Sequence, residues 1–423
     1  MRILIIGGGI AGCATALALH KAGFEPVVYE AHPESAEDLG AFLTLASNGM
    51  RALAQIDVAS IVADAGFPLT RLRVLDASGA TVADAPLGEH EDPRTRYRCL
   101  RRADLAVALQ RETERRGIAL KHAARLRALS ETDDGVTATF TDGSGAAGAL
   151  LIGADGLNST VRALLGPAAI EPRYAGQRVF YGYTTQAPPE PSGHITMIRA
   201  SGAAFGYACS PDGETFWFAR VPGPPAPADE IAATAPGQWR ERLVPVLRPD
   251  ATPAADIVQA TGDQLMVTNA CDLPVGIAWR TGRALIIGDA AHAASPATGQ
   301  GASMALEDAV VLAKALTRRP RPGRRTGRLR ACAPPQGRAQ HPGQRAADRR
   351  TTAIPARRAR AARRPAAATR LDHPAATRLR QQPQRGRSAA WTVRAGAGPR
   401  ADSRASVFAD MELRTLMVTA SAR

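Results

Sequence analysis

The chain has 423 residues, enough for two or three domains, and 45% of them are hydrophobic, which allows a sizeable core. No run of about 18 apolar residues occurs, which argues against a membrane-spanning helix. The net charge of +14 comes from an excess of arginine in the C-terminal quarter of the chain. Residues 318–423 hold 26 arginines against five acidic residues, a balance of +21, so residues 1–317 carry −7.

The cysteines are scattered, odd in number and without CxxC spacing. This pattern argues against a disulfide framework or a metal site and favours a reducing, cytoplasmic location. The N-terminus imitates a signal peptide, but three consecutive glycines directly after an apolar run fit a strand and a loop better. The five cysteines are Cys13, Cys99, Cys209, Cys271 and Cys332.

The first 30 residues predict a strand–helix–strand unit. Residues 2–6 form a short apolar run that ends at glycine, as in a buried strand. Residues 10–21 predict a helix and residues 26–30 the next strand. The segment Gly7-Gly8-Gly9-Ile10-Ala11-Gly12 joins the first strand to the helix, and Glu30 ends the second strand.

This glycine pattern predicts a dinucleotide-binding loop. Gly7 permits a tight turn, Gly9 allows a pyrophosphate to approach the backbone, and Gly12 allows the helix to pack on the strand. The helix N-terminus offers free N–H groups to the phosphates, and Glu30 accepts hydrogen bonds from the ribose. The loop alone does not distinguish FAD from NAD. The expected contacts are Gly7, Gly9, Ile10, Ala11, Gly12 and Glu30.

The rest of the body alternates between helical and extended patterns. A helix is expected from Ser47 or Asn48, and an amphipathic helix over residues 102–116. The other expected elements are strands at 71–75, 81–83, 126–129, 136–140, 149–152, 179–185, 194–199, 204–210, 215–221 and 284–287, and helices at 238–247 and 301–316.

Two further motifs follow strands. Asp155-Gly156 comes after the strand at residues 149–152. Gly288-Asp289-Ala290-Ala291-His292 comes after the strand at 284–287 and leads through Pro296 to Gly299-Gln300-Gly301-Ala302, where a helix begins.

The three motifs, in this order and spacing, resemble those of the class A flavoprotein monooxygenases, which include the para-hydroxybenzoate and salicylate hydroxylases. Residues 1–316 carry the resemblance. It implies an α/β fold with a Rossmann-like, GR2-type FAD-binding domain interleaved with a β-rich substrate domain. It also implies tightly bound FAD, NAD(P)H as a transient co-substrate, and O₂ that forms a flavin C4a-hydroperoxide and oxygenates a small phenolic or polyketide-like aromatic.

The resemblance assigns roles to single residues. Asp289 resembles the residue that binds the ribityl chain, and the backbone of Gly301 and Ala302 resembles the pair that faces the flavin pyrimidine. A helix N-terminus there stabilises negative charge on the reduced flavin. Pro296 and Gly299 belong to the same loop. Ser303 stands where many relatives have Asn.

Other residues have two interpretations. Asp155 resembles the residue implicated in FAD and NAD(P)H binding, but it is also placed to cap the next helix. Arg102 matches the arginine that approaches the FAD phosphates. His292 suggests a base but more simply packs near the flavin loop, and Cys13 more simply packs in the first helix. The substrate-activating base stays unassigned.

Aromatic side chains gather in the β-rich middle. A strand core explains most of them, while alternation brings some to the flavin side. The expected substrate-pocket residues are Tyr181, Tyr183, Phe205 and Trp217.

The expected domain boundaries follow from these elements. The FAD-binding domain takes residues 1–70, 101–170 and 276–317, and the substrate domain takes 71–100 and 171–275. Residues 318–423, rich in Arg, Ala and Pro, have no sustained period and no plausible core. They are either a disordered basic tail that binds nucleic acid or an out-of-frame translation that leaves the enzyme incomplete.

Rival functions are a reductase or halogenase of the same fold, or an inactive flavoprotein with a basic tail. The chain has no Trp-x-Trp-x-Ile of the halogenase kind, and the Asp155 motif favours hydroxylation.

Overall fold

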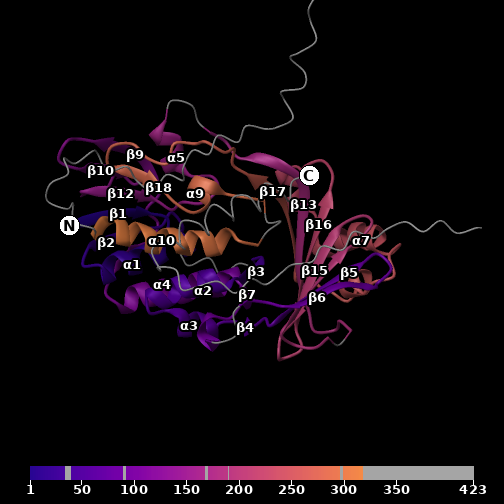
Figure 1. Cartoon of the computed structure of the whole chain (residues 1–423). Coiled ribbons are helices and arrows are strands. Elements are labelled where there is room, and N and C mark those ends of the chain that lie inside the picture. Colours follow the sequence, from indigo (N-terminus) through magenta and orange to yellow (C-terminus); the bar gives the residue numbers. More distant parts are fainter. Residues whose placement is uncertain (34–39, 89–91, 167–169, 189, 296–298, 318–423) are drawn as a thin grey trace, which may run out of the picture. The chain divides into compact units, whose positions relative to one another are not determined.

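The computed structural model describes residues 1–33, 40–88, 92–166, 170–188, 190–295 and 299–317. Within this part of the chain a parallel sheet and a large mixed sheet confirm the expected α/β fold (Figure 1). The expectations for Pro296 and for residues 318–423 lie outside the described residues.

A five-stranded parallel sheet forms the centre of the part that is expected to bind FAD. Its strands are short apolar runs, and Ile3, Leu4 and Ile5 are fully buried, as expected for a sheet covered on both faces. In sheet order the strands are β18 (Ala284–Ile286), β12 (Leu150–Gly153), β1 (Arg2–Ile6), β2 (Glu25–Tyr29) and β8 (Ala119–Lys121).

Helices cover one face of this sheet, and a small antiparallel sheet covers the other (Figure 1). Helix α1 is buried along most of its length because it lies between the sheet and α10. The helices are α1 (Ile10–Lys21), α2 (Ser47–Gln55), α3 (Ala59–Asp64), α4 (Arg102–Arg115) and α10 (Gly301–Thr317). The other layer has β9 (Leu126–Glu131), β10 (Val136–Phe140), β11 (Gly145–Gly148) and α5 (Thr160–Leu165).

A seven-stranded sheet forms the second part of the described chain. Two strands near residue 80 belong to this sheet, and one of them pairs with a strand from beyond residue 170, so the two parts are interleaved in sequence. In sheet order the strands are β17 (Leu265–Asp272), β13 (Arg173–Thr184), β16 (Thr215–Pro222), β15 (Ala204–Cys209), β14 (His194–Arg199), β5 (Arg71–Asp76) and β6 (Thr81–Pro86).

The two faces of the large sheet have different neighbours. One face packs on α7 (Pro236–Leu247) and α8 (Ala254–Gln259), and the other contacts a three-stranded sheet of the part that is expected to bind FAD. In that small sheet β7 (Arg98–Arg101) pairs with β3 (Phe42–Leu45) and β4 (Phe67–Pro68). The end of the segment 71–100, which we expected in the substrate domain, therefore belongs to this small sheet. The elements are α6 (Ala228–Ala233), α7 (Pro236–Leu247), α8 (Ala254–Gln259), β3 (Phe42–Leu45), β4 (Phe67–Pro68), β7 (Arg98–Arg101) and the 3-10 helix η1 (Pro93–Thr95).

Candidate cofactor and substrate site

Three of the loop glycines, Gly7, Gly9 and Gly12, have different surroundings. Gly7 has φ +102°, and a Cβ there would lie 2.4 Å from the carbonyl oxygen of Ala154. A Cβ on Gly12 would lie 1.8 Å from the carbonyl oxygen of Gly7. A Cβ on Gly9 would meet no protein atom within 4 Å. Internal packing therefore requires the first and third glycines, while the second faces open space at the start of α1, where a pyrophosphate would lie.

The peptide of Gly8 is held from two sides. Its N–H donates to Oε2 of Glu30 at 2.6 Å, and its carbonyl oxygen accepts from Nε2 of Gln110 at 2.8 Å. Oε1 of Glu30 accepts from the N–H of His32 at 2.9 Å. A carboxylate has about four acceptor positions, so Glu30 still has capacity for ribose hydroxyls. The sequence had not singled out Gln110.

Cys13 lies beside the same peptide. Its thiol donates to the carbonyl oxygen of Gly8 at 3.1 Å, and burial raises its pKa to about 12. Cys13 is therefore a packed thiol without nucleophilic character at neutral pH.

The Gly288-Asp289 motif begins the short helix α9 (Asp289–His292) and packs between two long helices. Gly288 has φ +57°, and a Cβ there would lie 3.0 Å from Cβ of Ala11 and 3.4 Å from Cβ of Ala305. Oδ2 of Asp308 accepts from the N–H of Gly288 at 2.9 Å and lies 2.7 Å from Nε2 of His292. The motif is thus fixed against both α1 and α10.

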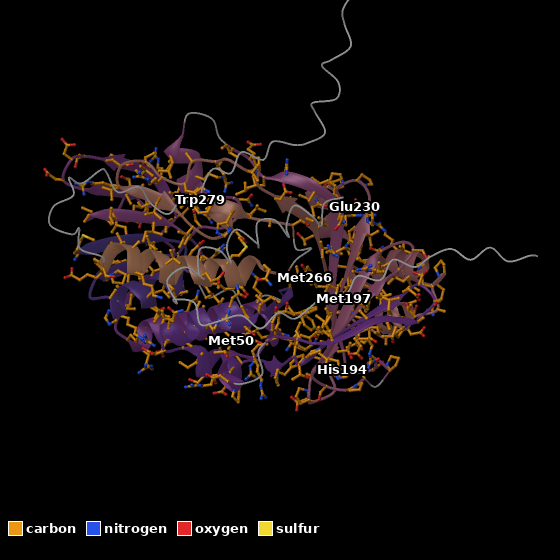
Figure 2. The ribbon with its side chains drawn as sticks, in the orientation of Figure 1. Met50, His194, Met197, Glu230, Met266 and Trp279 are labelled. Carbon is orange, nitrogen blue, oxygen red and sulfur yellow. The ribbon has the colours of Figure 1, made fainter. Side chains whose placement is uncertain are left out.

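His292 positions this motif. Burial alone would lower the pKa of its imidazole, but the hydrogen bond and the charge of Asp308 outweigh burial and raise it. Trp279, labelled in Figure 2, packs on the imidazole with 5.4 Å between ring centroids. These contacts agree with the packing interpretation of His292.

Asp289, the first residue of α9, lies near the first residue of α10. Its Oδ1 is 3.8 Å from the position that a Cβ on Gly301 would take. In the next turn, Oγ of Ser303 accepts from the N–H of Ala46 at 3.2 Å. A Cβ on Gly49 would lie 2.7 Å from the same Oγ, so Ser303 belongs to the contact between α10 and α2. Because the side chain of Ser303 is used in this contact, the backbone of Gly301 and Ala302 is the part of the first turn of α10 that is suited to a cofactor.

Asp155 follows β12 and is tied to α5. Its carboxylate accepts from Oγ of Ser159 at 2.5 Å and from the N–H of Val161 at 3.0 Å, while burial raises its pKa. These bonds support the capping interpretation. Any additional contact of Asp155 with a cofactor stays a prediction.

Two neighbouring arginines differ in environment. Arg102 begins α4 with an exposed side chain, and its N–H donates to the carbonyl oxygen of Ala41 at 2.9 Å. Nη2 of Arg101 donates to both carboxylate oxygens of Glu214, at 2.8 and 2.9 Å. The Arg101 guanidinium also lies 4.4 Å from the ring centroid of Tyr183. Arg101 therefore joins β7 to the large sheet, which leaves Arg102 as the arginine available to a phosphate.

A row of half-buried apolar side chains crosses the large sheet on the face toward β3. Strand pairing aligns Met266 with Tyr181, Tyr181 with Phe218, Phe218 with Gly206, and Gly206 with Met197. A Cβ on Gly206 would lie 2.5 Å from Phe218 and 2.8 Å from the sulfur of Met197, so this glycine makes room for both neighbours. Figure 2 labels Met197 and Met266 on this sheet. We call Met266, Tyr181, Phe218 and Met197 the apolar row.

The apolar row lies close to the start of α10 through β3. The ring of Phe42 lies 6.2 Å from the ring of Tyr181 and 6.0 Å from that of Phe218, centroid to centroid. Two residues further along β3, Oγ1 of Thr44 is 3.2 Å from the position of a Cβ on Gly299. The expected flavin loop and the apolar row are therefore separated by a single strand.

The structure brings only part of the expected substrate pocket together. Phe205 and Trp217 are fully buried on the opposite face, against α7 and α8, because strand alternation directs them away from Tyr181. Tyr183 is on the same face as Tyr181, but its hydroxyl donates to the carbonyl oxygen of Gly40 at 2.7 Å and its ring lies under Arg101. Tyr181 alone of the four remains suited to a substrate.

Comparison with known proteins shows the family of the chain. The family model of the FAD binding domain matches residues 1–329. The chain is 30% identical over 319 residues to aurachin C monooxygenase/isomerase of Stigmatella aurantiaca, covering 75% of this chain and 81% of that protein. It is 31% identical over 334 residues to 3-amino-4-hydroxybenzoate 2-monooxygenase of Streptomyces platensis, covering 74% and 79%.

A solved structure is also similar. Klebsiella pneumoniae HpxO complexed with FAD and uric acid superimposes with a TM-score of 0.67 and 28% identity, over 76% of this chain and 81% of that one. The chain belongs to the FAD binding domain family. Within it, the protein is an FAD-dependent monooxygenase of the class A type that its three motifs resemble.

Proposed function

We propose that the protein hydroxylates a small aromatic or heteroaromatic molecule, with NAD(P)H as electron donor and O₂ as oxygen source. The observation that carries this proposal is the meeting of the three motifs: Gly7 packs on Ala154 and Asp155, and Gly288 packs on Ala11. When bound, FAD supplies the redox chemistry, accepting a hydride and activating O₂ for transfer of one oxygen atom. The similar proteins named above act on aromatic or heterocyclic molecules.

The chain's own residues suit this cofactor. The N-terminus of α1 beside Gly9 would hold the pyrophosphate, with Arg102 adding positive charge, and Glu30 would accept from the ribose. Asp289 would accept from the ribityl hydroxyls. The first turn of α10 at Gly301 would stabilise negative charge at the flavin pyrimidine.

The substrate would lie against the apolar row. These side chains are only half-buried, whereas the opposite face of the sheet is packed on α7 and α8. Aromatic rings stack favourably on Tyr181 and Phe218, and the sulfurs of Met197 and Met266 contact aromatic edges well. The row would orient an aromatic ring beside the flavin and exclude water from it.

No helix among the described residues is long and apolar enough to cross a membrane. The four cysteines there are free thiols, which supports our proposal of a cytoplasmic location.

Two measurements test the function. We expect purified protein to bind FAD, seen by quenching of flavin fluorescence, and to oxidise NAD(P)H faster when a suitable aromatic compound is added. A folded protein that binds no FAD would overturn the proposal.

A further inference from the structure

The carbonyl group of Gly8 sets the direction of the next N–H group in the glycine loop. Nε2 of Gln110 donates to the carbonyl oxygen of Gly8 at 2.8 Å, and the thiol of Cys13 donates to the same oxygen at 3.1 Å. In a planar trans peptide the C=O and N–H groups point in opposite directions. The N–H of Gly9 therefore points away from Gln110 and from α4.

The N–H of Gly9 has no acceptor among the described residues. Gly9 is the N-cap residue of α1, where the positive end of the helix dipole favours an anion. A Cβ on Gly9 would meet no protein atom within 4 Å, so there is open space beside this residue. The Gly9 N–H is therefore a free donor next to the space proposed for the pyrophosphate.

The side chain of Gln110 makes a single hydrogen bond among the described residues, the one to Gly8. Gln110 is only 7% exposed, and its Oε1 is buried without a hydrogen-bond partner. Its amide nitrogen must face Gly8, because two carbonyl oxygens would repel each other. The thiol of Cys13 is a weak donor. Gln110 is therefore the stronger of the two groups that orient the Gly8 carbonyl.

The peptide between Gly8 and Gly9 needs such an anchor. Rotation of this peptide changes ψ of Gly8 and φ of Gly9, and two glycines place little steric restriction on either angle. The Glu30 carboxylate binds the N–H of Gly8, which belongs to the preceding peptide. The bond from Gln110, a residue 102 positions away in the chain, is thus the main restraint on the direction of the Gly9 N–H.

We propose that Gln110 is a positioning residue for the cofactor: through the Gly8 carbonyl it holds the Gly9 N–H toward the FAD pyrophosphate. This proposal rests on the proposed function and on the cofactor site at Gly9. Gln110 itself does not touch FAD. It presets a donor that would otherwise have to be oriented when the cofactor binds, and such preorganisation strengthens binding.

The test replaces Gln110 with Met, which keeps the length of the side chain and removes the donor. We expect FAD affinity, measured by quenching of flavin fluorescence, to fall at least about 10-fold, the effect of losing one charge-assisted hydrogen bond. The phosphorus NMR resonances of the bound pyrophosphate should also shift, because one donor has turned away from it. Urea denaturation without FAD shows whether the variant is folded.

Thr113→Val is the matched control on the same helix. Thr113 is fully buried, and its hydroxyl donates to the carbonyl oxygen of Leu109 at 2.7 Å, so this change also removes a buried polar group of α4 but leaves the bond to Gly8 intact. It should keep the FAD affinity and the phosphorus resonances of the unchanged protein. If Gln110→Met does not fold, Gln110→Glu decides. At pH about 8 its ionised carboxylate has a similar shape and no donor, so it should lose at least as much affinity.

The outcomes separate two failures. If the Gln110 variant binds FAD as tightly as the unchanged protein, or if Thr113→Val loses as much affinity, the role of Gln110 is wrong and the proposed function stands. A loss of affinity without a shift of the phosphorus resonances also overturns this role. If the unchanged protein binds no FAD, the proposed function fails first.

Discussion

Replacing Gly9 with Ala should separate cofactor binding from folding. A Cβ at this position meets no protein atom within 4 Å, and the backbone has φ −77° and ψ −165°, which alanine adopts readily. Loss of a glycine N-cap costs up to about 1 kcal/mol, and the smaller entropy of the unfolded chain returns about 0.4–1 kcal/mol. The free energy of unfolding of the FAD-free protein should therefore change by less than about 1 kcal/mol.

FAD binding should respond strongly to the same change. The added methyl group occupies the space proposed for the pyrophosphate and separates it from the N–H groups of α1. Losing one charge-assisted hydrogen bond costs about 1.5–3 kcal/mol, which corresponds to a loss of affinity of about 10- to 150-fold. Urea denaturation without FAD and fluorescence titration with FAD measure the two effects.

Gly12→Ala is the contrasting variant. Its Cβ would lie 1.8 Å from the carbonyl oxygen of Gly7, so α1 and the loop must move apart. Overpacking of this kind costs about 1–3 kcal/mol, and the FAD-free protein should lose stability. If Gly9→Ala bound FAD as tightly as the unchanged protein, the phosphate would not lie at Gly9 and the proposed cofactor site would be wrong.

Three further predictions concern side chains around this site. Asp155→Ala should lower stability by about 1–2 kcal/mol, through loss of its bonds to Ser159 and Val161, with little change in FAD affinity; a large loss of affinity at unchanged stability would contradict the capping role. Asp308→Asn should lower the pKa of His292, followed by NMR titration. The raised pKa of His292 in the folded protein stabilises the fold most below the unfolded value of 6.5. The variant should therefore lose more stability at pH about 5.5 than at pH about 9, and equal losses would refute the coupling between His292 and Asp308. Cys13 should resist iodoacetamide at pH about 8 in the native protein and react after unfolding, since its pKa is about 12; rapid native labelling would contradict its burial.

Much of the cofactor site is predictable from local sequence. Strand β1 and helix α1 have the expected bounds, because continuous apolar runs and glycine signals depend on neighbouring residues alone. The positive φ of Gly7 and the close approach of Gly12 to Gly7 likewise arise within one loop, whereas the contact of Gly7 with Ala154 does not. Gln110 was missed because its bond to Gly8 joins residues about a hundred positions apart, and no local pattern marks it.

The substrate face was harder to predict. Alternation shows that Phe180 and Tyr181 point to opposite sides, but it does not show which side faces β3. Phe205 and Trp217 were therefore placed on the wrong face, since the assignment depends on the pairing of β16 with β13 and on the position of α7. Strand β17 was missed, although it supplies Met266 to the apolar row.

Oxygen transfer is the most direct test of the whole account. FAD-loaded protein would be mixed with NAD(P)H, isotopically labelled O₂ and the aromatic compound that most accelerates NAD(P)H oxidation, and the products would be analysed by mass spectrometry. We predict one labelled oxygen atom in a ring-hydroxylated product, formed in step with NAD(P)H consumption. FAD-bound protein that consumes NAD(P)H and yields no labelled product with any bound aromatic compound would contradict the assignment as an aromatic hydroxylase.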